Sequence, residues 1–271
     1  MSFPDASGLI SEIDAFLKAN VVGCGECKSK CNCEVSRCRC LRDCKDFSAA
    51  GFDYNRCEKH RYLYICKYLI AHKFDIYSIL KCYSAQIRQH LGNLRSFSCL
   101  SFGGGPGTDL VGLLQWLYVS GIPGGTVNYV NFDKNASAWN NQIKKIRDYY
   151  EPKLAEKVTV NYKAVTNVEQ LERSEVIICS YVINELRRDS AKINLPVANP
   201  GIIILNDVNS DLSRESFSYI FEQLSECYSV QRFGPRVMIK EPCGELHPAR
   251  EEYCGQVWSK SVQDLFMVNS K

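Results

Sequence analysis

The chain has 271 residues, a formal net charge of +3 at pH 7 and 45% hydrophobic residues, a composition that allows a full-sized core. No apolar run approaches the ~20 residues that cross a bilayer, and the N-terminal stretch carries Glu12 and Asp14 but no basic leader. We therefore expect no membrane partner and no secretory signal, and we place the protein in the cytoplasm or the nucleus. Disulfides are uncommon in those compartments, so the 15 cysteines need another explanation.

The first third of the chain combines helical patterns with a cysteine-rich segment. Apolar residues at helical spacing predict a helix over 6–20. Residues 21–60 are rich in cysteine and have few large aliphatic side chains, so this segment cannot form a core of its own. Aromatic and aliphatic residues over 61–92 predict two helices that meet near 73–75, and the second ends at Gly92 as a C-cap.

From residue 96 onward, strands and helices alternate. Continuous apolar strands are typical of a parallel sheet that is covered on both faces. The alternation predicts an α/β domain at 96–271 with a doubly wound, Rossmann-like sheet, preceded by a helical and Cys-rich module at 1–95. Two late segments, 237–240 and 256–268, predict an antiparallel pair that closes the sheet. The expected strands are 97–102, 127–132, 158–165, 176–181 and 202–206, and the expected helices are 108–119, 136–150 and 212–227.

The turn between the first of these strands and its helix is the most informative stretch. It reads CLSFGGGPGTDL and places four glycines within 103–107, where the backbone can bend tightly and approach a ligand closely. A phosphate-binding P-loop needs Lys and Ser or Thr after the glycines, but Thr108 and Asp109 follow here. A dinucleotide-binding Gly-x-Gly-x-x-Gly pattern would need a glycine at Thr108. The carboxylate of Asp109 would also repel a pyrophosphate at the helix N-terminus.

The order Gly103-x-Gly105-x-Gly107 resembles motif I of the class I S-adenosylmethionine-dependent methyltransferases, and the resemblance covers about residues 96–268. It implies that the turn packs against the methionine part of the cofactor. It also implies that Asp133, which ends the second strand, holds the ribose hydroxyls, a role that suits the two acceptor oxygens of a carboxylate. The cofactor-binding residues expected from the resemblance are Ser101, Gly103, Gly104, Gly105, Pro106, Gly107, Asp109 and Asp133.

Two positions depart from the family's pattern. The family usually has an acid two residues before the first glycine, where this chain has Ser101, and an acid near the end of the third strand, where this chain has none. Asp109 is either a replacement for the first acid or an ordinary helix N-cap or acid of the first helical turn. The departures leave open a second interpretation, a domain that kept the fold and binds the cofactor weakly or not at all.

By the same resemblance, the end of the fourth strand faces the transfer site. Methyl transfer from a sulfonium mainly requires alignment of donor and acceptor, with a general base where the acceptor is an amine or hydroxyl. The candidate catalytic residues are Ser180, Tyr181, Asn184 and Glu185; Asn184 and Glu185 also suit a helix start. No Asn-Pro-Pro-aromatic tetrapeptide and no Pro-Cys pair follows the strand, which argues against amino-methylation of adenine or cytosine and carbon-5 methylation of pyrimidines.

The dense cysteines of the N-terminal segment predict a metal site. Thiolates at this density bind soft or borderline metals, zinc being the usual choice inside cells. Ligands one residue apart favour bridging thiolates in a polynuclear cluster, and the density resembles the zinc clusters that flank histone-methylating domains of a different fold. The expected ligands of this N-terminal site are Cys24, Cys27, Cys31, Cys33, Cys38, Cys40, Cys44, Cys57 and His60. A C-terminal set, Cys243, His247 and Cys254, is a second candidate.

The charge distribution suggests the partner. Residues 1–96 carry 15 Lys and Arg against 10 Asp and Glu, whereas the rest carries 18 against 20. A metal-ordered basic segment can contact phosphates, so the sequence favours a methyltransferase that acts on a macromolecule, with RNA as the expected partner and S-adenosylmethionine and zinc as cofactors. The alternatives are a methyltransferase for protein or small molecules, and a non-catalytic interaction protein braced by zinc.

Overall fold

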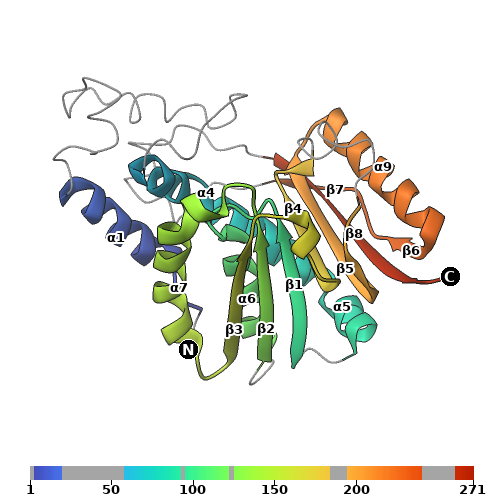
Figure 1. Ribbon diagram of the computed structural model, residues 1–271, viewed down its shortest axis with the longest axis horizontal. Coiled ribbons are helices and arrows are strands. Elements are labelled where there is room, and N and C mark those ends of the chain that lie inside the picture. The colour runs from blue at the N-terminus through green and yellow to red at the C-terminus, as the bar shows by residue number, and fades with distance from the viewer. Residues whose placement is uncertain (1–2, 20–57, 93–94, 122–124, 184–193, 240–259) are drawn as a thin grey trace.

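The structure is a computed structural model that describes residues 3–19, 58–92, 95–121, 125–183, 194–239 and 260–271. A central sheet of eight strands runs through the molecule in the order β3-β2-β1-β4-β5-β8-β6, and β7 pairs with β8 beside this path (Figure 1). The strands β1 to β5 are parallel to one another, and β8 is antiparallel to β5, β6 and β7. The expected doubly wound α/β arrangement and the late antiparallel pair are both confirmed. The strands are β1 Ser96–Phe102, β2 Gly125–Phe132, β3 Val158–Val165, β4 Ser174–Ser180, β5 Val197–Val208, β6 Tyr228–Arg232, β7 Arg236–Ile239 and β8 Lys260–Ser270.

The sheet is covered on both faces because alternate strand residues point into two different cores. In β1, Cys99 belongs to the larger core and the adjacent Leu100 to the smaller one; in β4, Ile178 and Ile177 divide in the same way. The larger core includes residues of α1, α4, α5, α6 and α7, and the smaller core is closed by α9. The helices are α1 Ala6–Ala19, α4 Glu58–Cys82, α5 Ser84–Leu91, α6 Thr108–Val119, α7 Asn140–Leu154 and α9 Asp211–Cys227.

The N-terminal helices share this larger core with the sheet. Helix α4 packs on α6, with α1 against α4, and the two helices α4 and α6 approach closely at Gly112. A Cβ atom on Gly112 would lie 2.7 Å from the Lys73 carbonyl oxygen and 2.8 Å from Ile76 Cβ. The close approach matters for the site because α4 carries side chains that reach the ends of the strands.

The helix break expected near 73–75 is wrong. Helix α4 continues to Cys82, and the break before α5 falls at Tyr83. Lys73 and Asp75 interrupt the apolar pattern, yet both are buried, at 7% and 0% exposure. Polar residues inside a helix thus mark an internal contact here, not a boundary. Gly92 does end α5 as expected, with its N–H bonded to the Arg88 carbonyl.

Three smaller differences concern element ends. The helix expected over 136–150 begins with a short 3-10 turn, η3 Ala136–Trp139, before α7. Strand β5 begins at Val197, earlier than expected, and includes the cis Asn199-Pro200 bond. Strand β6 was not predicted, because its five residues alternate only weakly between half-buried and exposed positions.

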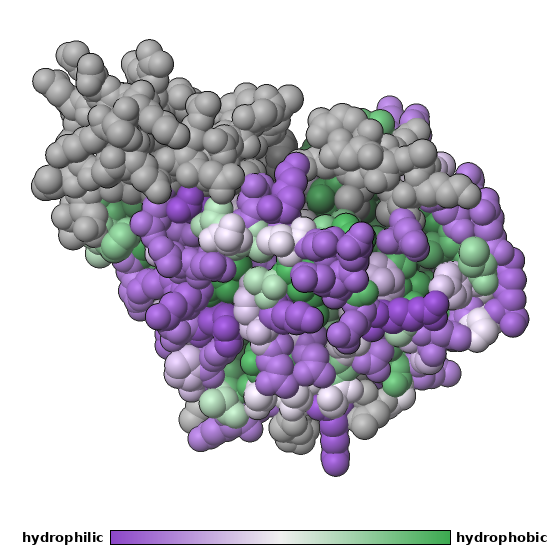
Figure 2. Space-filling model, viewed as in Figure 1, coloured by the Kyte–Doolittle hydropathy of each residue, from purple (hydrophilic) through white to green (hydrophobic). Residues whose placement is uncertain are grey.

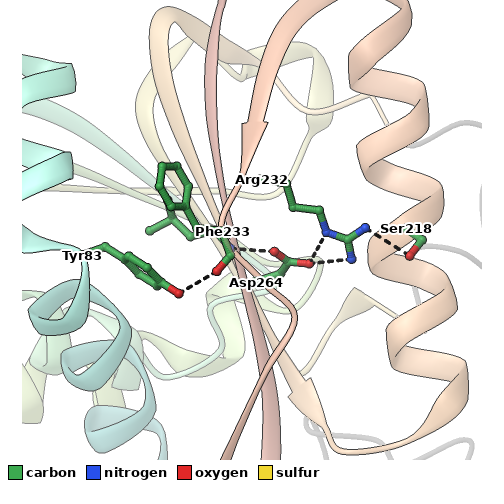
Figure 3. A network of polar contacts seen from close by, with 6 residues as sticks. Tyr83, Ser218, Arg232, Phe233 and Asp264 are labelled. Carbon is green, nitrogen blue, oxygen red and sulfur yellow. Dashed lines mark hydrogen bonds and ion pairs between the residues drawn. The ribbon is translucent and has the colours of Figure 1, made fainter.

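A polar network ties the turn after β6 to helices on both sides of the sheet (Figure 3). The buried Asp264 carboxylate accepts a hydrogen bond from Arg232 Nε at 2.8 Å, and Arg232 also donates to Ser218 of α9 at 3.3 Å. On the other side, the Tyr83 hydroxyl donates to the Phe233 carbonyl at 2.6 Å. Burial raises the pKa of Asp264 to about 6 in spite of Arg232.

The face seen in Figure 2 is mostly hydrophilic, and apolar side chains show mainly in recesses between the polar ones. Among the described helices, none is long and apolar enough to cross a bilayer.

Candidate functional site

The glycine turn lies at the carboxyl end of β1, where ligands bind in doubly wound sheets. Gly103, Gly105 and Gly107 have φ angles of 72°, 48° and 80°, in the left-handed region where a side chain is strained. The Gly-x-Gly-x-Gly order of the sequence therefore reflects the backbone directly: each alternate residue needs a left-handed conformation. Helix α6 begins immediately afterwards at Thr108.

The end of β2 holds this turn in place. The Phe132 carbonyl accepts hydrogen bonds from the N–H groups of Gly103 and Gly104, at 2.7 and 3.3 Å. Asp133 Oδ2 accepts from the Gly105 N–H at 3.0 Å, and its Oδ1 accepts from the Asn135 N–H at 2.7 Å. The acid expected at the end of the second strand therefore lies against the glycine turn.

The space beside Gly105 is bounded by Asp133 and an aromatic side chain. A Cβ atom on Gly105 would meet nothing closer than Trp139 Cε2 at 3.9 Å and Asp133 Oδ2 at 4.0 Å. A bare backbone, a carboxylate oxygen and an atom of the buried Trp139 indole thus lie around one place. These residues fit S-adenosylmethionine, whose adenosine offers a flat ring for an aromatic face and vicinal hydroxyls for a carboxylate.

Ser101 and Asp109 form a buried pair behind the turn. Ser101 Oγ donates to Asp109 Oδ2 at 3.0 Å, and the two residues are 0% and 3% exposed. The side chain of Asp109 does not cap α6, whose N-cap is Gly107. Burial raises the pKa of Asp109 to about 7, with a further rise from Asp75, whereas hydrogen bonds from Ser101 and Ser180 act in the opposite direction.

The two described candidates for catalysis, Ser180 and Tyr181, belong to a second buried network. Tyr181 has a φ of 57°, the only positive value among the described non-glycine residues, and its hydroxyl donates to Asp75 Oδ2 at 2.6 Å. Asn206 Nδ2 donates to Ser180 Oγ at 3.1 Å. Burial raises the pKa of Tyr181 well above its ordinary value, so the phenol keeps its proton at neutral pH.

Helix α4 supplies the residues that the sequence did not indicate. The Asp75 carboxylate also accepts from Ser261 Oγ of β8 at 3.1 Å, which connects α4 to β8 as well as to the end of β4. His72, one helical turn earlier, stacks on the Tyr181 ring with ring centroids 4.4 Å apart, and its Nδ1 lies 3.1 Å from Thr108 Oγ1. An acid and a histidine among the apolar residues in the middle of the helix are the signal that could have found them.

Several predicted residues lie outside the described ranges. These are Asn184 and Glu185 of the catalytic set, the second metal set Cys243, His247 and Cys254, and all eight cysteines of the first metal set, while His60 lies in α4 without a described side chain. Within the described residues, the side chains form no cluster that could hold a metal ion. The zinc prediction stays untested, because all eight cysteines of the first metal set lie outside those residues.

Comparisons with known proteins give only distant likenesses. No protein family model matches the sequence, and no curated protein does. Among solved structures, the magnesium protoporphyrin IX methyltransferase of Synechocystis PCC 6803 with bound S-adenosylmethionine is 14% identical, with a TM-score of 0.42 over 86% of this chain and 90% of that one. The precorrin-6y C5,15-methyltransferase of Geobacter metallireducens is 12% identical, with a TM-score of 0.40 over 69% and 87%. A tRNA methyltransferase of M. jannaschii is 13% identical, with a TM-score of 0.38 over 69% and 49%. The geometry of the site, and not these likenesses, supports the function proposed below.

Proposed function

We propose that this chain is an S-adenosylmethionine-dependent methyltransferase. The observation that carries the proposal is the glycine turn, which has three alternate left-handed glycines, the middle one of which donates a hydrogen bond to the acid that follows β2. A turn built in this way presents backbone and a carboxylate to one ligand at the carboxyl edge of the sheet. The sequence resemblance to class I methyltransferases names the ligand, and the surroundings of Gly105 fit it.

Each part of the site then has a role that its own chemistry supports. When bound, S-adenosylmethionine supplies an electrophilic methyl group on a sulfonium sulfur. The turn holds the cofactor through its backbone, Asp133 accepts hydrogen bonds from the ribose hydroxyls, and Trp139 covers one side. Because the Tyr181 hydroxyl keeps its proton and donates a hydrogen bond to Asp75, we do not assign to Tyr181 the removal of a proton from the acceptor.

We propose RNA as the acceptor and zinc as a structural metal. The support is in the sequence: basic residues such as Arg37, Arg39 and Arg42 are interleaved with the cysteines that precede α4. A cysteine-rich segment without a core of its own needs a metal to fold, and basic side chains held in that way contact phosphates. This segment is followed in the sequence by α4, the helix that reaches the site through Asp75 and His72.

The acceptor can be tested with labelled methyl groups. The full chain, purified with zinc, is incubated with S-adenosylmethionine carrying a tritiated methyl and with RNA or protein fractions separately. We expect label in RNA, an affinity for RNA that falls steeply with salt because phosphate contacts release counterions, and loss of labelling in Asp133→Ala. Label confined to protein would contradict the RNA proposal and leave the methyltransferase proposal standing.

A second candidate is a cofactor-binding interaction protein without transferase activity. The observation that favours it is that both described members of the expected catalytic set are engaged internally, Tyr181 with Asp75 and Ser180 with Asn206. Binding of the demethylated cofactor without label in any RNA, protein or metabolite fraction would support this candidate.

A further inference from the structure

We propose that Asn131 is a positioning residue for the glycine turn, and that Gly104 is a glycine because the Asn131 amide and the Ser101 hydroxyl occupy the place of its side chain. This inference rests on the proposed function for its ligand. It adds a residue that neither the motif nor the resemblance indicates, and it explains the one glycine of the turn that the Gly-x-Gly-x-Gly order leaves unexplained.

The first observation is a clamp on Gly105. Asn131 Nδ2 donates to the Gly105 carbonyl at 2.9 Å, while Asp133 Oδ2 accepts from the N–H of the same residue at 3.0 Å. Two side chains at the end of β2, one inside the strand and one directly after it, thus fix both polar backbone groups of one glycine. Because a carbonyl only accepts hydrogen bonds, the NH₂ end of the Asn131 amide must face it, and the orientation of the amide follows from its partner.

The second observation concerns Gly104. A Cβ atom there would lie 2.1 Å from Asn131 Oδ1 and 2.5 Å from Ser101 Oγ. Gly104 is not in the left-handed region where only glycine is relaxed, since the positive φ angles of the turn belong to its neighbours. The constraint on this position is therefore space, and the side chain that takes the space is the one that clamps Gly105.

The third observation is that Asn131 is fully buried and rigidly placed. It is 0% exposed and pairs with Ser101 in the parallel register of β1 and β2. Its Nδ2 also lies 3.2 Å from the Tyr162 hydroxyl of β3. Both hydrogen bonds are made by Nδ2, and the buried Oδ1 has no hydrogen-bond partner among the described residues. Displacing the amide would break both bonds of Nδ2, which costs free energy, so the sheet fixes the position of the turn.

These contacts have a consequence for the ligand. Asp133 accepts a hydrogen bond from the Gly105 N–H and is also the residue that we propose for the ribose hydroxyls. A displacement of the turn would therefore also displace the Asp133 carboxylate. Asn131 fixes the turn independently of Asp133. Without it, the cofactor must order the turn when it binds, and we expect about a tenfold weaker affinity, the effect of one hydrogen bond of about 1.4 kcal/mol.

The test compares Asn131→Ala and Asn131→Asp with Asn128→Ala. Asn128 is a matched control: it lies on the same strand, is exposed, and accepts from Asn161 of β3 at 2.9 Å, away from the turn. S-adenosylhomocysteine is titrated calorimetrically into the full-length variants at a temperature where urea unfolding shows each to be folded. We expect about tenfold weaker binding in both Asn131 variants and unchanged binding in Asn128→Ala.

A second measurement needs no ligand. Hydrogen exchange of peptides that cover 103–107 reports the N–H groups of the turn, and we expect faster exchange in Asn131→Ala than in Asn128→Ala. Equal affinity and equal exchange in folded Asn131 variants would overturn the inference while leaving the proposed function intact. If the unaltered protein fails to bind the cofactor, the proposed function fails, and the exchange result alone decides whether Asn131 positions the turn.

Discussion

Asp109→Asn provides a quantitative test of the buried pair behind the glycine turn. Asp109 is 3% exposed, and burial raises its pKa from 3.8 to about 7. The unfolded chain loses this proton near pH 4, whereas the native protein keeps it to near neutral pH. Between those values the native state binds more protons, so the free energy of unfolding falls as the pH rises.

The size of the effect follows from the shift. About three pKa units correspond to about 4 kcal/mol of lost stability once both states are ionised. Between pH 5 and pH 8 the unaltered protein should lose about 3 kcal/mol more than Asp109→Asn, which has the same shape and no charge to bury. At pH 8 the variant should therefore be the more stable protein.

Urea unfolding monitored by circular dichroism at several pH values between 5 and 8 measures this difference. Asp148→Asn, which removes an exposed carboxylate from α7, is the control and should follow the unaltered protein. Parallel stability profiles for Asp109→Asn and the unaltered protein would refute the reasoning, because they would mean that ionising Asp109 costs the native state nothing.

Three further changes test contacts around the site. Gly112→Ala should lower the free energy of unfolding by about 1–3 kcal/mol, because its Cβ would meet the α4 backbone at 2.7 Å; equal or greater stability in urea would contradict the close α4–α6 contact. Arg232→Met should destabilise the protein at pH 7 by about 3 kcal/mol, because it leaves the buried Asp264 carboxylate without its cation. The double variant Arg232→Met, Asp264→Leu should recover most of this loss of stability. A loss that persists in the double variant would show that the unpaired charge is not its cause. Tyr181→Phe removes the 2.6 Å donor to Asp75 and should lower stability by about 1–3 kcal/mol; an unchanged urea midpoint would mean that the bond contributes nothing.

The sheet and the turn could be predicted from the sequence because their signals are local. Continuous apolar runs defined β4 and the centre of β5, and the alternate glycines matched three left-handed residues. The position of Asp133 beside the turn was implied by the resemblance to class I methyltransferases, and the structure places Asp133 against Gly105. In each case the relevant residues are neighbours in the chain or belong to adjacent strands.

The contribution of α4 could not be predicted because its partners are distant in sequence. Asp75 and Tyr181 are 106 residues apart, and Asp75 and Ser261 are 186 apart. Without those partners, a buried acid in an apolar pattern looks like a helix boundary, which is why the break was expected near 73–75. Asn131 was missed for a related reason, since its role depends on the space above Gly104.

The most direct test of the central claim is calorimetric titration of S-adenosylmethionine and S-adenosylhomocysteine into zinc-replete full-length protein, beside Asp133→Ala. Removing Asp133 takes away both a clamp on Gly105 and the proposed ribose ligand. We predict micromolar binding by the unaltered protein and no detectable binding by the variant, which would establish the cofactor site. No binding by well-folded unaltered protein would contradict the methyltransferase proposal.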